Sequence, residues 1–310
     1  MAQTRFVRDT GLTARMTLTM FILGALFVAI VGILMAILPI QYAPIIALLG
    51  LGVAWWQWWN SDTLALKAMR AREVTEAEAP DLHGMIDRLC ASAGMPKPRV
   101  AIAYTDLPNA FATGRSPNRA AVCVTSGIMD RLTRDELEGV LAHELSHVAH
   151  RDVLVMTLAS SAGIIAGMLT RGAQWGMIGG RRKDDNGVPI WLLVLVVSIV
   201  TYAISFFATR LLSRYRELSA DRAGAFLTGK PGELANALIK ITGETSKIPQ
   251  KDLREVSSLN AFFITPAVAG VNWKTLTSTH PSLEQRLDQL AEVAAELGKP
   301  LDGGFAPPRA

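Results

Sequence analysis

The stretch HELSH at residues 143–147 carries the strongest structural and chemical signal in the sequence. Residues four apart on a helix lie on the same face, so the imidazoles of His143 and His147 can hold one zinc ion. Glu144 lies next to the first histidine and can take a proton from zinc-activated water. This pattern predicts a helix that binds one Zn²⁺ per chain, with Glu144 as the catalytic residue.

The residues before this stretch predict the helix that the chemistry needs. Thr133 is followed three residues later by Glu136, which is the spacing of a capping box. We expect the helix to continue from there to His150.

A catalytic zinc site also needs a third protein ligand and an open fourth position. The stretch RYRELSAD at residues 214–221 offers Glu217 and Asp221, one turn apart on a predicted helix. Glu217 could complete the zinc site, and Asp221 could accept a hydrogen bond from the outer nitrogen of a ligand histidine. By spacing alone, an ordinary exposed acidic pair is the more common arrangement. His150 lies roughly on the face of His143, but of the two residues Glu217 suits the third position better.

The composition indicates a membrane protein with a water-soluble part. Of the 310 residues 50% are hydrophobic, and residues 16–61 contain no charge at all. Apolar runs at 16–38 and 43–59 predict a transmembrane hairpin that ends in four tryptophans, as expected at lipid headgroups. The first run is too long for a typical signal peptide. Basic residues flank both ends of the hairpin, which places both in the cytoplasm: Arg5, Arg8, Arg15, Lys67, Arg70 and Arg72.

Two later apolar runs, at 153–170 and 188–209, leave two alternatives. If both cross the bilayer, the basic loop between them lies outside, against the usual charge bias. They can instead form a re-entrant hairpin. The sequence thus predicts two to four transmembrane helices.

The remaining sequence predicts an α+β, mostly helical catalytic domain. Short strands are expected at 99–104 and 120–125, with a possible edge segment at 109–114. Helical patterns occupy 79–93, 213–227, 231–242 and 282–297. His83, on the first of these helices, is expected to be structural.

Charge and cysteine content exclude several classes of protein. The net charge of +4 is too balanced for a nucleic-acid-binding protein, and no basic patch is interleaved with aromatics. Cys90 and Cys123 are far apart and indicate two half-buried structural thiols in a reducing compartment.

These motifs together resemble the HtpX family of membrane zinc metalloproteases, which is related to the CAAX prenyl proteases. The resemblance rests on residues 143–147, on SRYRELSAD at 213–221, on NAFATG at 109–114 and on HPS at 280–282. It implies a zincin-like catalytic domain in which Glu217 is the third zinc ligand and Asp221 supports a ligand histidine. The family often has a bulky aromatic residue where this chain has Leu218.

Two further residues are candidate contacts to substrate or transition state. Asn109 lies in a segment that the family places beside its active site, although a turn role is almost as well supported. His280 could stabilise a developing oxyanion, or it could cap and pack the helix that starts at Ser282.

The resemblance implies an endopeptidase of the bacterial-type inner membrane, multi-pass, with a cytoplasmic catalytic domain that degrades misfolded or damaged membrane proteins. A CAAX protease is the weaker alternative, because four apolar runs cannot easily enclose a prenyl lipid. A scaffold with a closed zinc site is the alternative from another class. We expect six segments: 1–15 cytoplasmic; 16–60 transmembrane hairpin; 61–152 catalytic; 153–209 hydrophobic with a loop at 171–187; 210–297 catalytic; and 298–310 flexible.

Overall fold

A computed structural model of the protein describes residues 10–37, 42–174, 190–247 and 280–299. Most of the predicted loop at 171–187 and of the tail at 298–310 lies outside these residues. The chain divides into two compact units. One unit comprises Met1–Thr13, Asn60–Val153 and Ser213–Ala310, and the other comprises Ala14–Trp59 and Leu154–Leu212.

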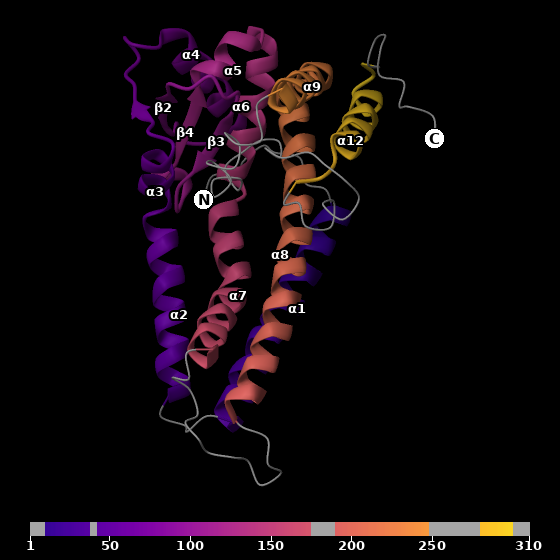
Figure 1. The fold of residues 1–310 in the computed structure, drawn as a ribbon. Helices are drawn as coiled ribbons and strands as arrows, with labels where there is room; N and C mark the ends of the chain where they lie inside the picture. The colour runs from indigo at the N-terminus through magenta and orange to yellow at the C-terminus, as the bar shows by residue number, and fades with distance from the viewer. Residues whose placement is uncertain (1–9, 38–41, 175–189, 248–279, 300–310) are drawn as a thin grey trace. The chain divides into compact units, whose positions relative to one another are not determined.

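The first unit is mostly helical with one small mixed sheet, as predicted (Figure 1). Its elements are α3 (Ser61–Ala68), β1 (Arg72–Glu73), α4 (Pro80–Ala93), β2 (Arg99–Ala103), β3 (Ala110–Thr113), η1 (Pro117–Arg119), β4 (Ala121–Thr125), α5 (Ser126–Arg131), α6 (Arg134–Ala149), α9 (Pro231–Lys247) and α12 (Leu283–Glu296). The predicted strands and helices of this unit are confirmed, except that the helix expected at 213–227 is part of a longer one; β1, α3, η1 and α5 were not predicted.

The sheet has the strand order β1-β2-β4-β3. β2 and β4 are parallel, and β3 runs antiparallel to β4, with Ala110 opposite Val124. β3 is an edge strand, as the sequence indicated for this segment.

Alternating side chains of the strands pack into two cores. Val100, Ile102, Val122 and Val124 point to the face that α4 and α6 cover. The other face carries Phe111 and smaller residues, among them Ala101 and Cys123, which pack with Ala65 and Leu66 of α3. The period of two along β2, β3 and β4, with both faces largely buried, places these strands between helical layers.

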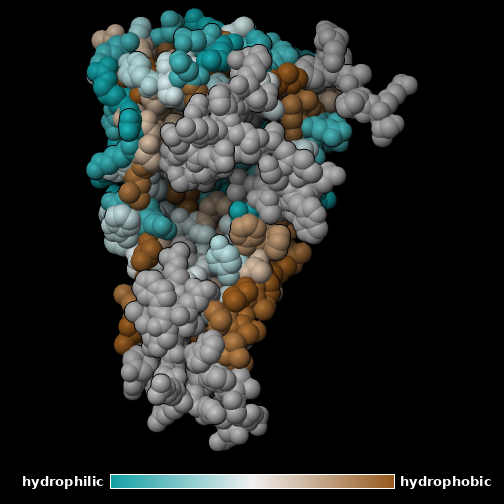
Figure 2. Space-filling model, viewed as in Figure 1, coloured by the Kyte–Doolittle hydropathy of each residue, from teal (hydrophilic) through white to brown (hydrophobic). Residues whose placement is uncertain are grey.

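The second unit consists of most of α1 (Thr10–Ile37), α2 (Tyr42–Trp59) and α7 (Asp152–Gln174), and of α8 (Ile190–Thr228) as far as Leu212. From Ser213 onward, α8 belongs to the first unit. Much of the surface of these helices that Figure 2 shows in colour is hydrophobic. Exposed apolar side chains include Leu18, Phe21, Leu48, Trp55, Val196, Ile199 and Phe207. Among the described residues, one helix is both long enough and apolar enough to cross a membrane, at Leu192–Thr228.

α8 is longer than the sequence suggested. We expected an apolar run that ends at residue 209 and a separate helix from Ser213, but one helix continues from Ile190 to Thr228. No glycine or proline lies between 209 and 213, so nothing interrupts the backbone hydrogen bonds of the helix.

Candidate metal centre

The helix α6 begins at a capping box, as predicted. The amide of Glu136 donates to the Thr133 hydroxyl (3.3 Å), and the amide of Thr133 donates to the Glu136 carboxylate (2.8 Å). These bonds satisfy amides that the first turn of a helix leaves unpaired. One turn apart near its other end, the helix carries His143 and His147, whose Nε2 atoms lie 3.1 Å apart.

Glu217 of α8 lies against both histidines. Its Oε1 is 3.4 Å from His147 Nε2, and its Oε2 is 3.8 Å from His143 Nε2. One candidate ligand atom from each residue lies within 4.8 Å of the other two. Two imidazole nitrogens and one carboxylate oxygen are a ligand set that suits zinc. Burial lowers the pKa of His143, which favours the neutral imidazole that binds metals.

Gly224 lets α8 approach α6 closely enough to bring Glu217 to the histidines. A Cβ at this position would lie 2.8 Å from the backbone nitrogen of His143 and 3.1 Å from the carbonyl carbon of Ala142. Glu217 and Gly224 are seven residues apart, so they lie on nearly the same face of α8. The glycine therefore sets the distance between the helices that carry the three candidate ligands.

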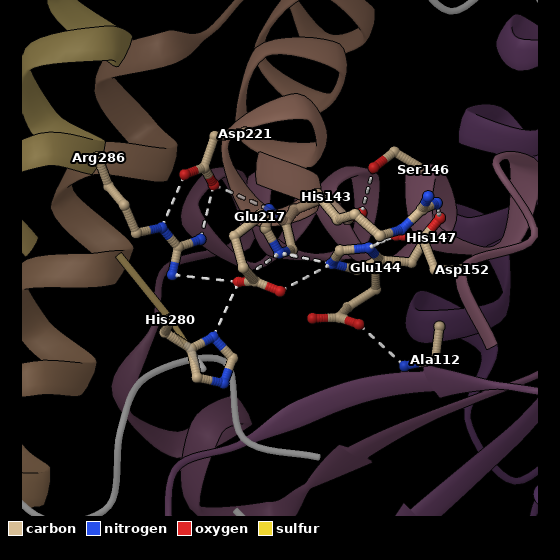
Figure 3. Close-up of polar contacts among 11 residues, drawn as sticks. Ala112, His143, Glu144, Ser146, His147, Asp152, Glu217, Asp221, His280 and Arg286 are labelled. Carbon is tan, nitrogen blue, oxygen red and sulfur yellow. Dashed lines mark hydrogen bonds and ion pairs between the residues drawn. The ribbon is translucent and has the colours of Figure 1, made fainter. Parts of the chain in front are cut away.

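Asp221 contacts His143 from the side away from Glu217 (Figure 3). Its Oδ1 lies 2.8 Å from His143 Nδ1. Arg286 of α12 donates from Nε (2.7 Å) and Nη2 (2.6 Å) to the same carboxylate. Both side chains are almost completely buried, with 0% of Asp221 and 2% of Arg286 exposed. Through this bidentate pair, Arg286 holds the negatively charged carboxylate of Asp221 against Nδ1 of His143.

A second carboxylate contacts His147. Asp152 Oδ2 lies 2.6 Å from His147 Nδ1, and Asp152 Oδ1 forms an ion pair with Arg216. Asp152, Arg216 and Arg286 were not predicted from the sequence as parts of the site. Arg286 had a readable signal, because it shares the apolar face of its helix with Leu290 and Val293, where a buried charge needs a partner. Asp152 and Arg216 had none of this kind.

Glu144 lies beside the edge strand of the sheet. Its Oε2 accepts a hydrogen bond from the amide of Ala112 in β3 at 2.9 Å (Figure 3). The side chain is buried, and this burial raises the pKa of Glu144 to about 7. The carboxyl group is therefore poised to exchange a proton near neutral pH.

The other candidate residues occupy different positions. His280 Nδ1 lies 3.0 Å from Glu217 Oε2, so His280 joins the cluster. Asn109 precedes β3 and is buried. Its backbone amide donates a hydrogen bond to the Thr125 hydroxyl, and its backbone carbonyl accepts one from the same hydroxyl. His150 directly follows the last residue of α6, and its carbonyl oxygen accepts a hydrogen bond from Arg216. His83 lies in α4, with its Nε2 3.0 Å from the Val74 carbonyl oxygen.

Comparisons with known proteins agree with this architecture. Residues 76–294 match the model of the family described as Peptidase family M48. Protease HtpX homolog 1 of Streptomyces coelicolor is 51% identical over 298 residues, which cover 96% of this chain and 97% of that protein. Protease HtpX homolog of Moorella thermoacetica is 49% identical over 293 residues, which cover 93% of this chain and 96% of that protein. The crystal structure of S. mikatae Ste24p shares the fold, with a TM-score of 0.53 and 18% identity over 88% of this chain and 64% of that chain.

Proposed function

This chain belongs to peptidase family M48 and to its HtpX-type proteases, and from that premise we propose that it is a zinc endopeptidase whose metal is held by His143, His147 and Glu217. The family makes it a membrane-associated metalloprotease that acts on proteins. The observation that carries the proposal is the meeting of these three side chains from two helices, with Glu144 next to the first of them.

Glu144 is the proposed general base and proton donor. When bound, a zinc ion supplies Lewis-acid chemistry that activates water and polarises a carbonyl oxygen. Glu144, whose pKa burial raises to about 7, takes a proton from the attacking water and returns it to the leaving amine. The Ala112 amide fixes the orientation of the carboxylate for this transfer.

The edge of β3 is the proposed binding site for the substrate backbone. An extended peptide can join an open sheet edge as an added strand, through main-chain hydrogen bonds. Because Ala112 of this strand contacts Glu144, a peptide that pairs with β3 passes the catalytic carboxylate. Asn109, at the start of the strand, and His280, beside Glu217, are the proposed further contacts to substrate or transition state.

The experiment compares the detergent-solubilised protein with Glu144→Gln and Glu217→Ala. We expect the parent and Glu144→Gln each to bind about one zinc per chain, and only the parent to cleave unfolded casein. Glu217→Ala should lose both zinc and cleavage. A parent without zinc, or a Glu144→Gln variant that cleaves at the parental rate, would show that the proposed mechanism is wrong.

We further propose two to four membrane-spanning helices, a catalytic unit in the cytoplasm, and misfolded or damaged membrane proteins as substrates. The apolar helix Leu192–Thr228 and the HtpX-type relatives support this setting. The likeness to Ste24p is one of fold alone, so we propose no prenylated substrate. Proteoliposomes that contain a membrane protein in folded or destabilised form test the preference, because equal cleavage of both forms would contradict it.

A further inference from the structure

The outer nitrogen of His147 has a carboxylate partner that comes from the next helix. Asp152, the first residue of α7, places Oδ2 2.6 Å from His147 Nδ1 (Figure 3). Asp152 is itself buried, with 8% exposed. A carboxylate here accepts the Nδ1 proton, which leaves the lone pair of Nε2 directed toward the other two candidate ligands.

The junction between α6 and α7 has an unusual backbone that returns Asp152 to His147. α6 ends at Ala149, and Arg151 has a φ of 56°, in the left-handed region that residues other than glycine rarely adopt. Asparagine, aspartate and glycine tolerate this conformation better than arginine does. A strained turn that persists next to a metal site is retained where the contacts around it require the geometry.

Arg216 holds Asp152 in this position. It forms an ion pair with Asp152 Oδ1, and its Nη2 donates to the carbonyl oxygen of His150 at 3.4 Å. The arginine is buried, with 5% exposed, and directly precedes Glu217 on α8. One turn of α8 thus supplies a candidate metal ligand and the cation that compensates the buried charge of Asp152.

The two histidines are held by equivalent arrangements from different parts of the chain. His143 contacts Asp221, which is paired with Arg286, and His147 contacts Asp152, which is paired with Arg216. Only the first carboxylate was readable from the RYRELSAD motif. The equivalence argues that Asp152 acts on the metal site and is more than a residue in the first turn of α7.

We propose that Asp152 and Arg216 are positioning residues that fix the tautomer and ring orientation of His147 for metal binding, and thereby connect the metal site to the start of α7. The inference rests on the zinc site proposed above. It concerns the side chains around the ligands and assigns to neither residue a contact with substrate.

The test measures zinc affinity in the full-length, detergent-solubilised protein by competition with a chromophoric chelator. Asp152→Ala should weaken zinc binding by about 10–100-fold, the usual effect of removing such a partner. Asp152→Asn, which keeps the size and one acceptor oxygen, should recover part of the affinity. Arg216→Gln should weaken binding in the same direction. The matched control is Asp135→Asn on α6, which breaks an exposed ion pair with Lys230 and should leave the affinity unchanged.

Two further readouts separate this role from a merely structural one. Thermal unfolding of the metal-free variants reports the fold alone, and the visible spectrum of the cobalt-substituted protein reports the ligand geometry, which should change in Asp152→Ala. If Asp152→Ala does not fold, Asp152→Asn provides the test. A zinc affinity and a cobalt spectrum equal to those of the parent would then overturn the inference.

Glu217→Ala distinguishes failure of the inference from failure of the proposed function. Zinc affinity that depends on Glu217 but is insensitive to Asp152 overturns the positioning role and leaves the zinc protease intact. Zinc affinity that is insensitive to Glu217 overturns the proposed site, and the inference with it.

Discussion

Gly224 of α8 faces the backbone nitrogen of His143 so closely that a Cβ on Gly224 would lie 2.8 Å from it. The obstacle is the backbone of α6, which cannot rotate away as a flexible side chain would. The contact joins the helix that carries Glu217 to the helix that carries both histidines. The close approach of these two helices therefore depends on a residue without a side chain.

Gly224→Ala should separate α8 from α6 and displace Glu217 from the histidines. We expect a loss of about 1–3 kcal/mol in the free energy of unfolding, the typical cost of overpacking, and a zinc affinity reduced by about tenfold or more, as for other disturbed ligand positions. The control is Gly243→Ala in α9, where a Cβ meets nothing within 4 Å. That change should leave zinc binding unaltered and stabilise the helix by about 0.5–1 kcal/mol. Equal zinc affinities in the two variants would contradict the prediction.

Arg286→Met should destabilise the protein strongly, because it leaves the Asp221 carboxylate buried without its bidentate partner. Removal of one member of a buried ion pair typically costs about 3–5 kcal/mol. The measurement is denaturant unfolding of the metal-free protein. Glu296→Gln on the same helix breaks the more exposed pair with Arg222 and should cost at most about 1 kcal/mol. Similar losses of unfolding free energy in both variants would show that the buried Asp221–Arg286 pair contributes no more to stability than the exposed pair does.

The two thiols should make the fold sensitive to alkaline pH. Burial raises the pKa of Cys90 to about 11 and that of Cys123 to about 12, against about 8.5 in an unfolded chain. The folded state therefore keeps protons that the unfolded state releases, so their contribution is complete below about pH 8.5 and is lost as pH rises toward the folded-state values.

Between pH 8 and pH 10 the free energy of unfolding should fall by about 2 kcal/mol for each thiol. The double variant Cys90→Ala with Cys123→Ala is the control, since it keeps the pH dependence of all other groups. An identical decrease in parent and control would refute the prediction. Iodoacetamide at pH 8 should also label both thiols slowly until the protein is unfolded.

Removal of the metal should lower stability in a way that depends on the candidate ligands. At zinc concentrations about 100 times the dissociation constant, binding to the folded state adds about 2.7 kcal/mol. EDTA should abolish this increment in the parent, and His143→Ala should lack it from the start. His83→Gln is the matched control, because His83 contacts the Val74 carbonyl outside the metal group. That variant should keep the full zinc-dependent increment, and its loss there would argue against the assigned site.

Much of the first unit could be predicted because its signals are local. The capping box at Thr133, the one-turn spacing of His143 and His147, and the alternation of Val122 and Val124 in β4 each depend on residues a few positions apart. Helix and strand periods are properties of the neighbouring backbone, so these elements were readable without tertiary contacts. The motif alone sufficed to expect zinc chemistry.

The contacts around the ligands depend on residues distant in the sequence. Arg286 reaches Asp221 across 65 positions, and Arg216 reaches the carbonyl of His150 across 66. A glycine within a helix, as at Gly224, has no local reason to exist, and only the packed neighbour explains it. The sequence by itself therefore predicted most of the helices and strands and the residue types of the candidate metal site. Tertiary packing decided which buried charges meet and how closely two helices approach, because burial makes an ion pair obligatory without specifying its partner.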